Sequence, residues 1–174
     1  MNSLVFKWWV QFVGLIFAAA MMQYFHIWEA LQQADKTYIS YAIVGILFVG
    51  MICCGAISRS IEIAGNEQYY DWILATKIQM AKKLYTYVGY MCKLAATLGL
   101  VGTVTGFLMM MPKFTATVMD PAAIGNIQVV QTMILSTMAG MSTAFVTTLV
   151  GLVVAAFLEF QLTMIETNSE WFEK

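Results

Sequence analysis

The stretch Val129–Leu158, VVQTMILSTMAGMSTAFVTTLVGLVVAAFL, decides the fold class because it is long, apolar and free of charged side chains. A helix needs about 20 apolar residues to cross a bilayer core about 30 Å thick. Backbone polar groups in lipid must be bonded within the protein, and the length of the stretch favours a helix over the shorter strands of a barrel. The stretch therefore predicts a membrane-spanning helix.

Three further apolar blocks precede it, and the predicted spans cover about 8–28, 38–58, 94–111 and 129–158. Of the 174 residues, 60% are hydrophobic and 11% are charged, and the mean hydropathy is +0.74. In soluble domains about a quarter of the residues are charged, so this composition excludes a soluble globular domain. A net charge of −1 provides no basic surface for nucleic acid. We expect an all-α, polytopic membrane protein with a single membrane domain over residues 1–174.

The distribution of Lys and Arg predicts how the chain is oriented. Seven of these nine residues fall on one side of the predicted membrane, namely Lys7, Arg59, Lys77, Lys82, Lys83, Lys93 and Lys174. Basic residues are retained in the cytoplasm, so both termini and the loop 59–93 are predicted to be cytoplasmic, and the loop 112–128 periplasmic. The helical period of apolar residues in 59–93 predicts a helix that continues into the third span. Asp120-Pro121 predicts the start of a helix that leads into the fourth span.

Small residues recur in the third and fourth spans at helical spacing. The residues predicted to pack the two helices together are Gly99, Gly102, Gly106, Gly140, Ala144 and Gly151. Small side chains three or four residues apart allow helix backbones to approach closely. Threonine hydroxyls in the same spans can bond to carbonyls of their own helix. Helix packing alone is therefore one interpretation of the pattern.

Two motifs in these spans resemble the MotA/TolQ/ExbB ion-channel family. LGLVGTVTG at 98–106 looks like that family's third-span signature, and AFVTTLVGLVVA at 144–155 is similar to its following span. The resemblance implies a pentameric ring in the bacterial inner membrane, with the third and fourth helices lining a central pore. It also implies a dimer of MotB/TolR/ExbD-like partners within the ring, each with a single span that carries an essential Asp.

The resemblance further implies that Thr103 and Thr148 line the inner surface of the ring. The chain departs from Exb-type members at Thr143, where they often carry a Glu, and Thr143 and Thr147 add hydroxyls that keep sodium coupling open beside proton coupling. The middle of every span lacks Asp, Glu, Lys and Arg, residues that usually mark ion pathways in membranes. An acid for ion transfer would therefore come from another polypeptide.

Two titratable residues near the predicted ends of spans have two interpretations each. Glu159 is either a solvated helix end or an exit-side acid that attracts cations or pairs with Lys93. His26 is either an interfacial side chain beside Trp28 or part of a proton path. One His and three scattered Cys do not form a metal site, so we expect no metal and no cofactor apart from the transported H⁺ or Na⁺.

We interpret the chain as the ring-forming subunit of a motor that couples the proton motive force, or a sodium gradient, to work, and not as an enzyme. The flagellar members of the family that the chain resembles have a much larger loop between the second and third spans, which contacts the rotor. The shorter loop 59–93 therefore favours the TolQ/ExbB class. Two alternatives to the motor remain open at this point. In one the chain is a non-conducting four-helix scaffold, and in the other it is an ion channel that needs no partner.

Overall fold

The chain folds into helices only, in the part that the computed structural model describes: residues 4–26, 29, 35, 37–64, 71–118 and 127–168. The helices are α1 (Leu4–Tyr24), α3 (Ile39–Ala64), α4 (Asp71–Val118) and α6 (Ile127–Asn168). Each of these helices is long and apolar enough to cross a membrane. The predicted all-α fold with four membrane-length helices is confirmed.

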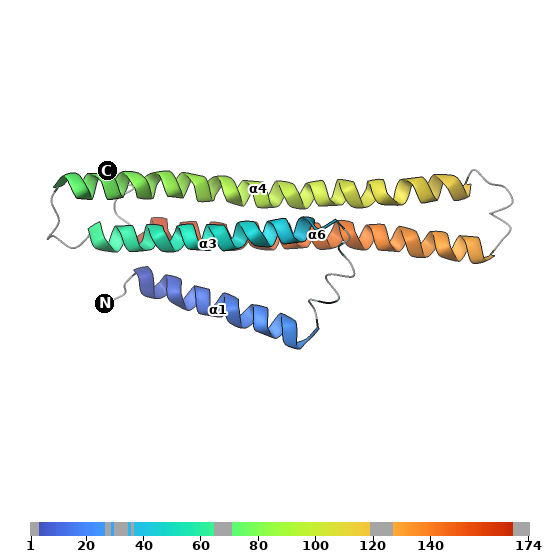
Figure 1. Cartoon of the computed structure of the whole chain (residues 1–174), viewed down its shortest axis with the longest axis horizontal. Helices are drawn as coiled ribbons and strands as arrows, with labels where there is room; N and C mark the ends of the chain where they lie inside the picture. The colour runs from blue at the N-terminus through green and yellow to red at the C-terminus, as the bar shows by residue number, and fades with distance from the viewer. Residues whose placement is uncertain are drawn as a thin grey trace.

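Helices α4 and α6 form a long antiparallel pair, with α3 beside them (Figure 1). At 1.5 Å per residue, the 48 residues of α4 extend about 72 Å and the 42 residues of α6 about 63 Å. Both lengths are about twice the thickness of a bilayer core. The predicted continuation of the segment before the third span into that span is confirmed, because α4 is unbroken from Asp71.

The helix ends differ from those expected. Helix α4 continues through Pro112 to Val118, and α6 begins at Ile127, so both ends of the expected loop 112–128 are helical. Proline has no backbone N–H, so one carbonyl in the preceding turn of the helix loses its hydrogen bond. Membrane helices tolerate a proline where neighbouring groups satisfy that carbonyl. Helix α1 begins at Leu4, before the start of the expected span 8–28, and ends at Tyr24, before the end of that span. It ends there because the chain turns at Phe25 and His26, and His26 has a φ of 54°.

Two of the expectations fall outside the described residues. They are the end of the first span at Trp28 and the helix start at Asp120-Pro121.

The core lies where α3, α4 and α6 meet. Its buried apolar side chains include Ile57 from α3, Val88 and Ala95 from α4, and Val154 and Leu158 from α6. Leu158 lies against Gly50 of α3, where an added Cβ would be 2.7 Å from its Cδ2 atom. The absence of a side chain at this position is what admits the leucine between the helices.

Helix α1 lies nearest to this bundle at its N-terminal end and diverges from it toward its C-terminal end (Figure 1). The ring of Trp8 covers Gly55 of α3, where a Cβ would lie 2.6 Å from the ring atom Cζ2. The Trp8 indole Nε1 donates a hydrogen bond of 3.2 Å to the carbonyl of Met51. Trp8 is therefore the main attachment of α1 to α3.

The carboxylate of Asp35 holds the start of α3. Its Oδ1 accepts hydrogen bonds from the Thr37 amide at 2.9 Å and the Thr37 hydroxyl at 2.7 Å, and its Oδ2 accepts one from the Ser40 amide at 3.0 Å. Burial raises the pKa of Asp35, but the hydrogen bonds from Ser40 and Thr37 outweigh this effect and hold the pKa below its ordinary value. The charged form is thus the one that stabilises the fold.

Replacing Asp35 with Ala should lower the free energy of unfolding at neutral pH by about 1–2 kcal/mol, because amides at the start of α3 lose their acceptor. The folded-state pKa is lowered, so this contribution is present above the unfolded pKa and is lost as the pH falls through the folded one. Thermal unfolding in detergent from pH 7 to pH 3 should show the difference between variant and native chain shrinking. Glu29→Ala, an exposed acid of the same connection, is the control and should change stability little at either pH.

Candidate functional site

The interface of α4 and α6 is built on small residues whose backbones touch. A Cβ on Gly99 would lie 3.3 Å from the Cα of Gly151, and one on Gly106 would lie 2.8 Å from the carbonyl oxygen of Gly140. A Cβ on Gly151 would in turn lie 2.8 Å from the carbonyl oxygen of Ala95. The structure thus places the glycines of the two helices opposite one another in one continuous seam.

Ala144, the other small residue expected to pack, faces Gly106 across this seam, since a Cβ on that glycine would lie 2.9 Å from the methyl carbon of Ala144. The seam also includes Ala95, which was not singled out from the sequence. Its signal was present, because Ala95 stands four residues before Gly99 and so continues the same face of the helix.

Thr143 and Thr147 lie inside the subunit. They are 1% and 0% exposed, and the side chain of Thr147 occupies the space that the absent side chain of Gly102 leaves. The Thr147 hydroxyl donates to the carbonyls of Thr143 at 3.0 Å and Ala144 at 3.1 Å, and the Thr143 hydroxyl donates to Ala139 at 3.1 Å. In the single subunit, neither hydroxyl lies on an accessible surface.

Thr148 borders the seam, since its hydroxyl reaches the carbonyl of Gly99 in α4, and Thr103 stands next to the seam residue Gly102 along α4; both are half-buried. The Thr148 hydroxyl lies 3.0 Å from the carbonyl oxygen of Ala144 in its own helix and 3.2 Å from that of Gly99 in α4. The Thr103 hydroxyl donates to Leu100 at 2.6 Å. Sequence reasoning did not predict that Thr148 bonds across the interface, because the facing carbonyl belongs to the backbone of another helix.

These hydroxyl contacts determine what the interface can do chemically. A hydroxyl has one proton to donate and two lone pairs to accept with, and here the proton is directed at a backbone carbonyl. What remains on Thr103 and Thr148 is acceptor capacity, which suits a cation or the O–H of a protonated carboxyl group. The sequence has no Asp, Glu, Lys or Arg within 94–111 or 127–158, so the chain supplies no titratable acid at this depth.

Glu159 and His26 lie away from the threonine pair at the seam edges. Glu159 is exposed, and its backbone carbonyl accepts a hydrogen bond of 2.9 Å from Thr163; within the described residues its carboxylate makes no ion pair with Lys93. His26 follows the end of α1 and lies 3.3 Å from the carboxylate of Glu29 (Nδ1 to Oε1). No group of three or more potential metal ligands occurs among the His, Cys, Asp and Glu residues that the structure describes.

The fold and composition define a multi-pass membrane protein. The model of the MotA/TolQ/ExbB proton channel family matches residues 57–172, about two thirds of the chain, and the chain belongs to this family. The matched region contains α4, α6 and the whole seam between them. No curated protein and no solved structure matches the chain.

A single methyl group added to the seam should separate α4 from α6. Gly106→Ala places a Cβ against the backbone of α6, which cannot move aside as a side chain can, so we expect a loss of about 1–3 kcal/mol in the free energy of unfolding. Gly89→Ala is the matched control in α4, because a Cβ there meets nothing within 4 Å and alanine favours the helix by about 0.5–1 kcal/mol. Thermal unfolding of both variants in detergent checks this, and an equal response of the two would contradict the seam.

Proposed function

We propose that this chain is the ring-forming subunit of an ion-driven motor, in which several copies surround a partner whose single span carries the membrane acid. One observation carries the proposal: in a chain of the proton channel family, the close-packed α4–α6 pair presents hydroxyl acceptors and has no acid of its own between the ends of its spans. Ion transfer through such a surface needs a titratable group from another polypeptide. A pentamer around a partner dimer is the arrangement that the family resemblance implies.

Thr103 and Thr148 are the proposed ion-path residues. Both lie at seam edges with acceptor capacity left over, so they can accept a hydrogen bond from a protonated partner carboxyl or replace part of an ion's hydration. Thr143 and Thr147, considered for the same role from the sequence, are enclosed within the subunit. In this proposal they hold α4 and α6 together and do not contact the ion.

The energy available suits a rotation in small steps. One elementary charge that crosses 100 mV releases about 2.3 kcal/mol. This is of the same order as the cost of disturbing a few packed side chains at a helix interface. A ring that moves by one subunit per ion would therefore need to break and remake only a limited set of contacts with its partner.

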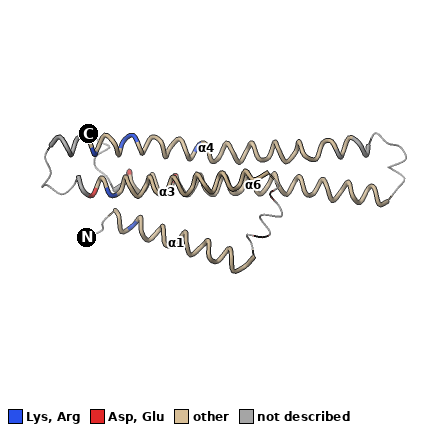
Figure 2. Tube along the Cα trace, in the orientation of Figure 1, with Lys and Arg blue, Asp and Glu red and all other residues tan. Residues whose placement is uncertain are grey.

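We further propose that the chain lies in the bacterial inner membrane with both termini in the cytoplasm. Most of the charged residues drawn in Figure 2 gather at the end of the bundle where the termini lie. Arg59, Lys77, Lys82 and Lys83 belong to this end, and basic residues are retained on the cytoplasmic side. The opposite end, where α4 and α6 approach their connection, is then periplasmic.

Replacing Thr148 with Val should remove partner-dependent ion flux, by about tenfold or more, and leave assembly intact, because valine keeps the branched shape but has no acceptor. The measurement is potential-driven ion uptake by liposomes that hold the chain together with a single-span, Asp-bearing partner, whose gene we expect beside that of this chain. Co-purification of the partner reports assembly. Thr132→Val is the matched control, because that hydroxyl is exposed on α6 and bonds only to its own helix, at 2.6 Å to Gln128 and 3.2 Å to Val129. Normal flux in Thr148→Val would count against the proposed path.

The purified chain without a partner should leave liposomes impermeable to both H⁺ and Na⁺. A self-sufficient channel would instead conduct alone, and ion-sensitive dyes inside the liposomes distinguish the two outcomes.

A scaffold is the second candidate function, and it is favoured by the donation of the Thr103, Thr147 and Thr148 hydroxyl protons to carbonyls within the chain. It predicts no flux with the partner or without it. Flux that appears only with the partner therefore supports the motor and excludes both alternatives.

A further inference from the structure

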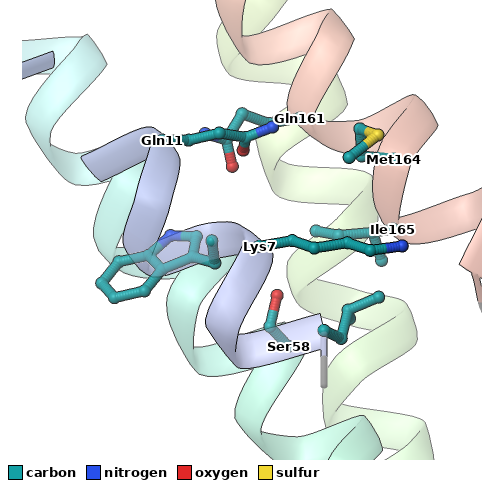
Figure 3. Close-up of a pocket in the computed structure, with 8 residues that line it drawn as sticks. Lys7, Gln11, Ser58, Gln161, Met164 and Ile165 are labelled. Carbon is teal, nitrogen blue, oxygen red and sulfur yellow. The ribbon is translucent and has the colours of Figure 1, made fainter. Parts of the chain in front are cut away.

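A recess between α1, α3 and α6 contains polar side chains that the proposed ion path does not use. Figure 3 shows Lys7 and Gln11 of α1, Ser58 of α3 and Gln161 of α6 around it. Trp8 and Ile165 are among its apolar lining residues. The recess lies at the end of the bundle where α1 is attached, so three helices meet around one polar space.

The amide of Gln161 is the unusual group in this recess. The side chain is 2% exposed, and its Nε2 donor has no hydrogen-bond partner within the described part of the chain. Its neighbours along α6 that belong to the core are Leu158, Leu162 and Ile165, so the amide stands at the margin of an apolar cluster. A buried donor without an acceptor is costly, and such groups in proteins usually bond to an ordered water or another ligand.

The size and chemistry of the recess suit a single water molecule. The space open to the centre of a water molecule is about 10 Å³, which is about the room that one buried water requires. Ser58, itself 1% exposed, brings a hydroxyl, and Gln11 brings a second amide. A site for one water needs two to four polar partners, and these three side chains come from three different helices.

We propose that this recess binds one water molecule, which accepts a hydrogen bond from Gln161 Nε2 and bonds to Ser58 or Gln11 on the facing helices. Helix α1 has no buried residue of its own and diverges from the bundle toward its C-terminal end. The water then joins α6 to the neighbouring helices beside the Trp8 attachment. This inference does not depend on the proposed motor function, since it concerns the internal assembly of one subunit.

A density map of the protein in lipid nanodiscs, at a resolution that shows waters, tests the site directly. We expect a single spherical peak within hydrogen-bond distance of Gln161 Nε2. Density that continues out of the recess as a lipid headgroup, or no density at all, would overturn the proposal.

Thermal unfolding of Gln161→Leu provides a second test, because the change in Tm has one sign if the recess holds a water and the opposite sign if it is dry. If a water bonds to the amide, the apolar variant loses those bonds and its Tm falls. If the donor has no acceptor, leucine removes an unfavourable group and the Tm rises or stays the same, which would contradict the water site. Gln131→Leu on the exposed surface of α6 is the matched control, and its Tm should not fall.

Discussion

The contact between the backbones of α4 and α6 is the constraint on which the rest of the structure depends. Lipid provides no hydrophobic force that drives membrane helices together, so their association rests on close packing and interhelical hydrogen bonds. The glycines along the seam allow both. They bring carbonyls of one helix within reach of the other, as the bond from Thr148 to Gly99 shows. The same closeness decides which hydroxyls are enclosed and which stay at an edge.

Much of the fold could be predicted because the decisive signals are long. An uncharged stretch of membrane length has few alternatives to a helix, and the pattern of residues before the third span indicated that α4 would be continuous. The ends were harder to predict. Whether Pro112 stops a helix depends on how the freed carbonyl is satisfied, and that is a property of the surroundings and not of the local sequence.

The candidate site was predictable in part. The spacing of small residues indicated where the two helices would meet, but neighbouring hydroxyls were harder to distinguish. Thr147 and Thr148 point about 100° apart around the helix axis, so one is enclosed against Gly102 and the other borders the seam. That difference requires knowledge of the position of α4. The recess at Gln161 required even more, because its three walls come from helices far apart in the sequence.

The length of α4 and α6 has a mechanical consequence. Each helix is about twice as long as a bilayer core is thick, and the two lie side by side, with close backbone contact between 95–106 of α4 and 140–151 of α6. If the pair tilts as a unit, a slight tilt at the level of the lipid becomes a displacement of several ångström at its far tip. This amplification follows from the length of the helices alone. It would transmit a small movement within the membrane to any molecule that contacts the far ends of the helices.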